Sequence, residues 1–113
     1  MRTIIAGSRD IWSYDLLERA IDEIDWPITQ VVCGMARGAD SVGWAWAHIN
    51  GVLIDERPAD WDGLGKPAGI IRNVAMANNA DALILLWDGQ SKGSQHMLGT
   101  AHRRRLKIKV IHP

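Results

Sequence analysis

The 113-residue chain contains no phenylalanine, one tyrosine and one cysteine, and its basic and acidic residues balance to a formal net charge of zero. A single cysteine excludes an intrachain disulfide, and Cys33 stands in an apolar run, where we expect it to pack as a small hydrophobic residue. Zero net charge gives no global attraction to nucleic acid or to acidic membranes. No apolar run approaches the roughly 18 residues of a membrane-spanning helix. The N-terminus shows no secretory pattern, so we expect a cytoplasmic protein.

The remaining composition is typical of a soluble globular protein, with 47% hydrophobic and 23% charged residues. This length supports one hydrophobic core, and no repeat or linker interrupts the chain. We therefore expect a single domain that spans residues 1–113. The six tryptophans are unusual, because an indole ring can stack on a ligand as well as fill a core.

Short apolar runs alternate with helical stretches along the chain. The predicted strands cover residues 3–6, 30–33, 52–54, 82–87 and 109–111. The predicted helices cover 16–24, with Ser13 as N-cap, and then about 42–49, 67–79 and 94–101. On the second helix, the residues expected to face the core are Val42, Ala45, Trp46 and Ile49. The alternation predicts an α/β fold with a mostly parallel five-stranded sheet between two layers of helices.

In sheets of this kind, ligands bind beyond the carboxyl ends of the strands. Three of the predicted strands end in glycine-containing loops, which begin at Gly7-Ser8-Arg9, at Gly34 and at Asp88. Because the strands are expected to be parallel, these loops converge on one rim of the sheet. The sequence therefore predicts a ligand site at that rim.

The loop over residues 34–40 runs from a predicted strand into a predicted helix. Gly34 and Gly38 permit a close approach of the backbone to a ligand, and the helix start at Ala39 and Asp40 offers unpaired N–H groups to an anion. Arg37 can add a bidentate contact to phosphate. The spacing matches neither the dinucleotide fingerprint nor the P-loop. Simple turn and helix-start roles explain the two glycines equally well.

The loop over residues 88–94 has the same form. It contains Gly89 and Gly93, and Ser94 either caps the following helix or donates its hydroxyl to phosphate. A capped connection is the simpler interpretation of this loop alone. Two such loops at one rim favour an anion site that bridges them.

The segment over residues 58–73 is long and glycine-rich for a connection in so short a chain, which is typical of functional loops. Trp61 provides a stacking surface, and Lys66 and Arg72, with Asn73 beside it, bring positive charge and polar groups. A mobile surface loop that carries ordinary solvated side chains is the alternative interpretation.

The other polar and aromatic residues give weaker signals. The four histidines lack metal-ligand spacing, so we expect neither a metal nor a cofactor. Five cations lie within residues 103–109, and we interpret them as stabilising a helix C-terminus rather than as a nucleic-acid site. Trp44 and Trp46 are two residues apart on a predicted helix and cannot share a face. An exposed tryptophan often marks an interface, so homo-oligomerisation is a hypothesis.

Four motifs follow one another in a characteristic order. They are Gly7-Ser8-Arg9-Asp10, the loop 34–40, Ala59-Asp60-Trp61 with Arg72-Asn73, and Trp87-Asp88-Gly89 with Gly93-Ser94. In this order and spacing the chain resembles the SLOG superfamily over residues 4–111, and within it a small branch of bacterial and phage proteins. The resemblance implies a Rossmann-like three-layer α/β/α sandwich that binds nucleotides or nucleotide-derived ligands. Other members are the Lonely Guy phosphoribohydrolases, which release a base from a nucleoside monophosphate, and the DNA-processing protein A family, which binds single-stranded DNA.

Within the resemblance, Gly93-Ser94 matches the Gly-Thr of the phosphate-binding motif and keeps its hydroxyl, and Arg72 matches an arginine of the second motif. Met97 stands where the phosphoribohydrolases have a catalytic glutamate. The resemblance therefore implies ligand contacts without that carboxylate. If the protein is an enzyme, the candidates are Arg72 and a relocated carboxylate, Asp60 or Asp88.

We expect a module that binds a nucleotide or a nucleotide-derived phosphate ligand, as a sensor or a sequestering protein. One alternative is a hydrolase of the N-glycosidic bond in nucleotides. A second alternative is a protein that binds single-stranded nucleic acid through Trp61 and the cations of residues 103–109.

Overall fold

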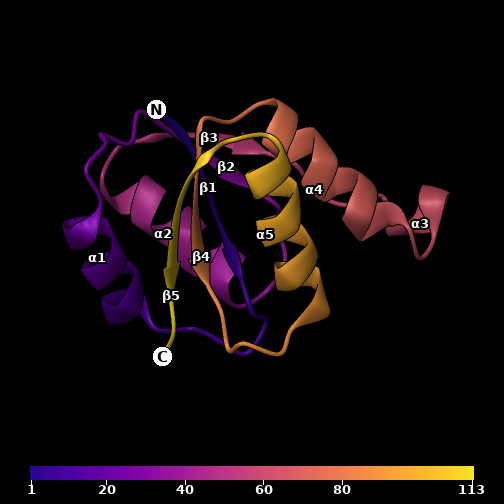
Figure 1. Cartoon of the computed structure of the whole chain (residues 1–113), viewed down its shortest axis with the longest axis horizontal. Helices are drawn as coiled ribbons and strands as arrows, with labels where there is room; N and C mark the ends of the chain where they lie inside the picture. The colour runs from indigo at the N-terminus through magenta and orange to yellow at the C-terminus, as the bar shows by residue number, and fades with distance from the viewer.

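The computed structural model describes all residues from 1 to 113, and its centre is one five-stranded sheet (Figure 1). The strands are β1 (Arg2–Gly7), β2 (Gln30–Cys33), β3 (Leu53–Glu56), β4 (Ala82–Leu86) and β5 (Lys107–Ile111). Their order across the sheet is β3-β2-β1-β4-β5, and every neighbouring pair is parallel. The predicted α/β class is confirmed, and the sheet is parallel throughout rather than mostly so.

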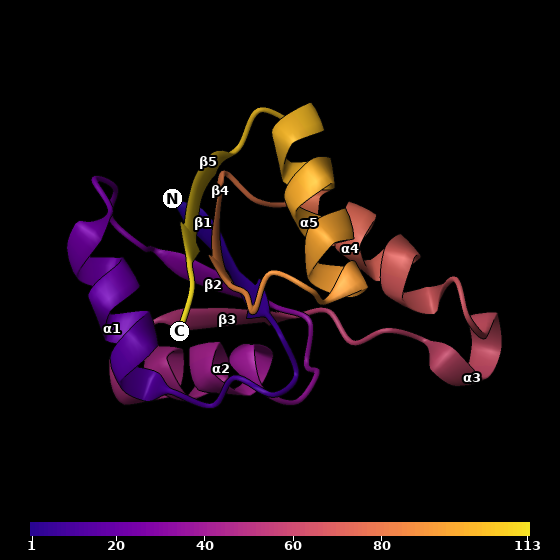
Figure 2. The same ribbon diagram turned by 60° about the horizontal axis from the view of Figure 1, so that its bottom comes forward.

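Helices cover both faces of the sheet. They are α1 (Tyr14–Glu23), α2 (Ala39–Ile49), α3 (Trp61–Leu64), α4 (Ala68–Asn78) and α5 (Lys92–Arg103). Figure 2 shows α1 and α2 on one side of the strands, with α4 and α5 on the other. The result is the expected three-layer α/β/α sandwich of Rossmann-like form. None of these helices is long and apolar enough to cross a membrane.

Alternation along the central strands divides the core into two halves. On β1, Ile5 packs towards α1 and α2, while its neighbour Ile4 packs in the opposite half with α4 and α5. On β4, Ile84 and Leu83 divide in the same way. Successive strand side chains point to opposite faces, so a strand covered on both sides is apolar without interruption. Cys33 is buried in the first half, as expected for a small hydrophobic residue.

Helix starts agree only partly with the sequence-based predictions. Ser13 caps α1 as predicted, and its hydroxyl accepts the N–H of Leu16. The cap of α5 is Ser91 rather than Ser94, which lies inside the first turn and is 4% exposed. The two serines are three positions apart, and both are chemically suitable caps. Local sequence therefore did not distinguish them.

The predicted inner face of α2 was wrong at its C-terminal end. Val42 is buried, but Ile49 is 70% exposed, and the helix packs instead through its small residues Gly43 and Ala47. An ideal Cβ on Gly43 would lie 2.6 Å from a side-chain carbon of Ile5. The helix thus approaches the sheet too closely for a larger side chain at this position.

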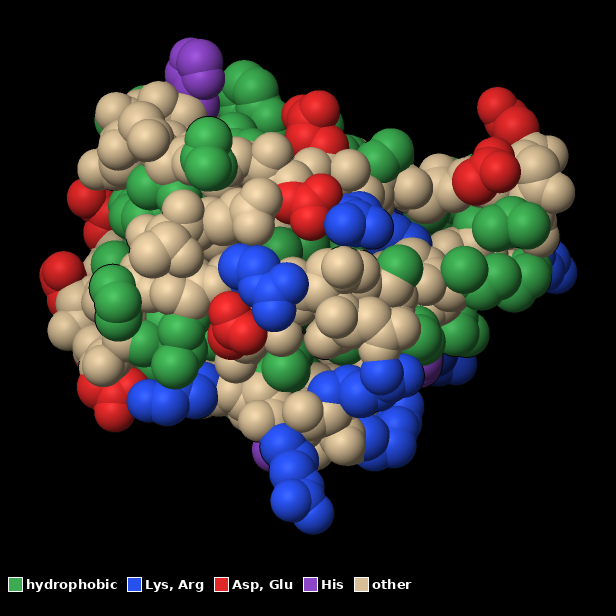
Figure 3. All heavy atoms as spheres, turned by 90° about the horizontal axis from the view of Figure 1, so that it is seen from above, with side chains coloured by type: hydrophobic (Ala, Val, Ile, Leu, Met, Phe, Trp, Pro, Cys, Tyr) green, Lys and Arg blue, Asp and Glu red, His purple; other side chains and the backbone are tan.

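A short arm projects from the body of the molecule. The connection after β3, expected as a loop, contains α3, which lies at the end of this arm in Figures 1 and 2. Figure 3 shows hydrophobic side chains gathered on the arm, with acidic ones beside them. Trp61 and Ile70 are about half exposed there.

Trp44 lies elsewhere, on α2, where it stacks on His48 and its indole N–H donates to Glu56. These contacts do not test homo-oligomerisation through this tryptophan, which stays a prediction.

The strand order creates a point where the chain reverses its direction across the sheet. From β1 the chain moves outward to β2 and β3, and it then returns to form β4 on the other side of β1. The loops that leave β1 and β4 therefore begin side by side, with Gly7 and Leu86 as register partners. Ligands of open α/β sheets bind at such a point.

Candidate functional site

A cavity of about 590 Å³ opens at the carboxyl end of the sheet, where the chain reverses. Its walls come from the loops after β1 and β4, the start of α2, the α3–α4 segment and the first turns of α5. The predicted ligand-binding residues that line it are Gly7, Ser8, Arg9, Asp40, Trp61, Lys66, Arg72, Asn73, Gly93 and Ser94. Asp88 lines it as well. The structure thus brings together residues from four segments that are distant in sequence.

Six predicted site residues lie outside the cavity wall. They are Gly34, Arg37, Gly38, Ala39, Asp60 and Gly89. Most of them have structural roles. Gly38 has φ 77° and packs against the main chain of Arg9, where a Cβ would lie 2.4 Å from a carbonyl oxygen. Asp60 caps α3 by accepting the N–H of Gly63. Arg37 is exposed and contributes nothing to the cavity wall.

Ser8 joins the parts of the cavity. Its N–H donates to the Leu86 carbonyl, and its hydroxyl accepts the N–H of Asp88 at 3.0 Å. Its own carbonyl accepts the N–H of Ala39 at the start of α2. Since Ser8 is 1% exposed, these bonds are shielded from water and hold the two loops and α2 in one frame.

The loop after β4 presents the N-terminus of α5 to the cavity. The Asp88 carboxylate accepts the N–H groups of Gln90 and Ser91, and these bonds lower the pKa of Asp88. Ser91 then caps the helix, while the N–H groups of Lys92 and Gly93 have no partner within the chain. Unpaired N–H groups and the helix dipole together favour an anion at this position.

Arg72 lies on the opposite wall, on α4. Its guanidinium donates to the Gly34 carbonyl and to the side-chain oxygen of Asn73. It forms no ion pair with a carboxylate, so its positive charge is not neutralised within the chain. A guanidinium held in this way can bind a phosphate or another anion.

Gly34 makes this position of Arg72 possible. A Cβ on Gly34 would lie 2.6 Å from Nη1 of Arg72 and 2.7 Å from Oδ2 of Asp40. Any side chain here would therefore push both groups away. The glycine therefore makes room for Arg72 and Asp40 beside the cavity, and its predicted approach to a ligand stays a prediction.

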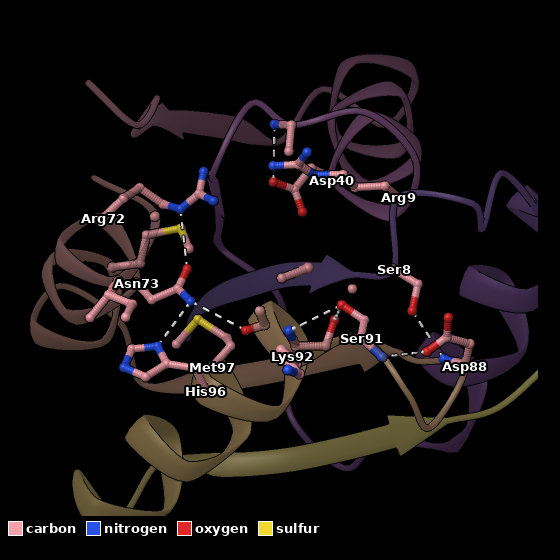
Figure 4. A pocket seen from close by; sticks show the side chains of 18 of the residues that line it. Ser8, Arg9, Asp40, Arg72, Asn73, Asp88, Ser91, Lys92, His96 and Met97 are labelled. Atoms are coloured by element: carbon pink, nitrogen blue, oxygen red, sulfur yellow. Dashed lines mark hydrogen bonds between the residues drawn. The ribbon is translucent and has the colours of Figure 1, made fainter. Parts of the chain in front are cut away.

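Asp40 is the most unusual group in the cavity wall. It is 4% exposed, and its Oδ2 accepts the N–H of Ala36 at 3.1 Å. Burial raises the pKa of Asp40 from its ordinary 3.8 to about 6, although the Ala36 N–H and the positive charges of Arg72 and Arg9 oppose the rise. Figure 4 shows its second oxygen directed into the open part of the cavity. A strongly perturbed carboxyl group in a cleft is a candidate functional residue.

Sequence reasoning missed His96, which lines the cavity from α5. One ring nitrogen meets the side-chain nitrogen of Asn73 at 3.2 Å, and the other lies 3.5 Å from the Thr100 hydroxyl. Burial, together with the charge of Arg103, lowers the pKa of His96. The ring and Asn73 thus tie α4 to α5 beside Arg72 (Figure 4). Nothing in the sequence indicated which residue this histidine would meet.

Sequence reasoning also missed Lys92 and Ser91, although their place in a glycine-rich loop before a helix was an available signal. Met97 lines the cavity and is 2% exposed, with its side chain packed in the core half that faces α4 and α5. An apolar side chain therefore occupies the position for which the resemblance implies a catalytic glutamate in the phosphoribohydrolases. No cluster of three or more His, Cys, Asp or Glu residues could hold a metal ion.

The fold and the cavity define a Rossmann-like α/β protein whose topological switch point holds a cleft lined by four cationic and three acidic side chains. A family model described as "YspA, cpYpsA-related SLOG family" matches residues 1–63. The chain belongs to this SLOG family. It is also 31% identical over 118 aligned positions to the Gene 61 protein of Mycobacterium phage D29, an alignment that covers 95% of this chain and 93% of the phage protein. No solved structure gives a significant match.

Proposed function

We propose that the protein binds a nucleotide or a nucleotide-derived phosphate ligand in this cavity, as a sensor or a sequestering protein. The main support is the convergence of the α5 N-terminus with four cationic side chains, Arg9, Lys66, Arg72 and Lys92, around one volume of about 590 Å³. The phosphate binds at the unpaired N–H groups of Lys92 and Gly93. Arg72 approaches it from the opposite wall.

The base of the ligand contacts the arm side of the cavity. Trp61 and Ile70 line the cavity there, and both are about half exposed in the free protein. The Trp61 ring packs over Gly69, where a Cβ would lie 3.1 Å from the indole. An indole held against a backbone in this way offers its other face for stacking on a base.

Turnover of the ligand is the second candidate function. The carboxylate expected from the phosphoribohydrolases is replaced by Met97, Asp60 lies outside the cavity, and Asp88 is engaged in holding its loop. Asp40 is the buried carboxyl group that lines the cavity, and it is the group that hydrolysis of an N-glycosidic bond would require. The binding role needs no such chemistry, so we place it first.

Binding of single-stranded nucleic acid has less support. Lys and Arg side chains gather along one edge of the molecule in Figure 3, but Lys107 and Lys109 pair with Asp25 and Glu23. The exposed arginines at 103–105 lie at and just after the C-terminal end of α5, about 18 Å from the turn that faces the cavity. Steep salt dependence of binding would be needed to support this role.

The experiment combines ligand binding with product analysis. The purified protein is incubated with nucleoside mono-, di- and cyclic phosphates and ADP-ribose-type compounds, and thermal stabilisation and released products are measured together. Stabilisation with intact ligand supports the binding role, whereas free base supports hydrolysis. Stabilisation by none of these compounds contradicts the proposed function.

A further inference from the structure

The carboxylate of Asp40 is in an unexpected place for a cavity that binds an anion. It is 96% buried at the start of α2, and it forms no ion pair, although Arg9 and Arg72 lie close enough to affect its ionisation. Oδ2 accepts the Ala36 N–H, the Gly7 N–H also stabilises the ionised carboxylate, and the second oxygen faces the cavity (Figure 4). The side chain is fixed in the cavity wall, so a ligand that covers this oxygen must offer it a hydrogen-bond donor.

An ionised carboxylate only accepts hydrogen bonds, and it repels a phosphate group. The phosphate of the ligand must therefore lie at the α5 N-terminus and not against Asp40. The part of the ligand that reaches Asp40 has to carry hydrogen-bond donors. In a nucleotide those donors are the sugar hydroxyls and the polar edge of the base.

The arrangement of the walls favours the sugar. The flat apolar surface that suits a base is on the arm, at Trp61 and Ile70. Asp40 lies on a different wall, in the frame that Ser8 forms with α2 and the loop after β4. The Ser8 carbonyl holds the start of α2, and its hydroxyl holds Asp88 at the beginning of the anion-binding loop. The hydrogen bonds of Ser8 therefore hold Asp40 and the proposed phosphate position in a fixed relation to each other. A fixed relation suits a sugar and a phosphate, because the two are joined covalently at short range.

We propose that Asp40 recognises the ribose of the ligand, with its carboxylate accepting hydrogen bonds from the sugar hydroxyls, so that the cavity selects ribonucleotides over 2′-deoxyribonucleotides. This inference rests on the proposed nucleotide-binding function. It adds the class of sugar, and it makes Asp40 a specificity-determining residue rather than only a support for the loop at Ala36. A site built around a hydroxyl rejects an analogue that lacks it, because its buried acceptor is then left unpaired.

The test compares ribo- and 2′-deoxyribonucleotides with the same base and the same phosphates, for each of the four bases, by calorimetric titration of the whole protein. We expect the ribonucleotide to bind at least about tenfold more tightly, since a hydrogen bond to a charged group is worth about that factor or more. In Asp40→Asn, this ratio falls at least about threefold towards one. In Asp62→Asn the ratio is unchanged, because Asp62 is exposed on α3 and does not line the cavity.

The comparison in the wild-type protein needs no variant, so the test holds even if Asp40→Asn does not fold. Equal affinity for ribo- and deoxyribonucleotides would overturn the inference while leaving the proposed function intact. So would an Asp40→Asn protein that keeps its ribose preference, or one that changes only its choice of base. Failure of every nucleotide to bind would instead remove the proposed function itself.

Discussion

Replacing Asp40 by asparagine should stabilise the protein at neutral pH. Burial raises the pKa of this carboxyl group from 3.8 to about 6, so its ionised form is less favourable in the folded than in the unfolded chain. Each pKa unit corresponds to about 1.4 kcal/mol, so ionised Asp40 costs the fold about 3 kcal/mol at pH 7. Asparagine removes this cost and keeps an oxygen to accept the N–H of Ala36.

The pH dependence of the free energy of unfolding tests the direction of this effect a second time. Between about pH 4 and pH 6 the folded protein holds a proton on Asp40 that the unfolded chain has lost, so this group makes stability fall as the pH rises. The penalty is absent below about pH 4 and complete above about pH 6. The stability gained by Asp40→Asn should therefore be large at pH 7 and should disappear towards pH 4.

Urea unfolding of the wild-type protein and the variant at several pH values between 4 and 8 measures this difference, because contributions from other titrating groups cancel in the comparison. Asp62→Asn is the matched control, since Asp62 is exposed on α3, and its stability should stay within about 0.5 kcal/mol of wild type. An Asp40→Asn protein less stable than wild type at pH 7, by an amount that does not vary with pH, would refute the reasoning. Asp40 would then stabilise the fold as a structural cap.

Two further substitutions, one of them with a matched control, test the frame of the cavity and the prediction of a helix cap. Gly34→Ala should weaken nucleotide binding at least about tenfold, because the new Cβ displaces Arg72. The control is Gly99→Ala on α5, where the new Cβ meets only an arginine side chain at 3.4 Å. This control should stabilise the protein by about 0.5–1 kcal/mol and leave affinity unchanged, as thermal melting and calorimetry can check. Equal affinities in the two variants would contradict this account. Ser13→Ala should lower the free energy of unfolding by about 0.5–2 kcal/mol in urea titrations with no change in affinity, since only the cap of α1 is lost.

The sequence predicted the fold well because the determining signals were local. Apolar runs separated by helical periodicity fix the strand and helix order, and Ser13 with its following helix is a local pattern. The rule that ligands bind at the carboxyl ends of parallel strands then located the cavity. Gly7, Ser8, Ser94 and Arg72 all line it for this reason.

The parts that escaped prediction depend on contacts between distant segments. Ile49 continued the apolar periodicity of α2 but is exposed, because the helix packs through Gly43 close to the sheet. The pairing of Asn73 with His96 joins two helices that local sequence cannot orient relative to each other. Arg37 had the right chemistry for phosphate and faces solvent outside the cavity instead.

The most direct test of nucleotide binding in this cavity is calorimetric titration of the best-stabilising nucleotide into wild-type, Arg72→Ala and Arg37→Ala proteins, each first shown to be folded. We predict saturable binding to wild type and a loss of at least about tenfold in Arg72→Ala, because a charge-assisted bond to phosphate is removed. Arg37→Ala should bind as wild type does, since Arg37 does not line the cavity. Unchanged affinity in Arg72→Ala, or an equal loss in both variants, would contradict the account.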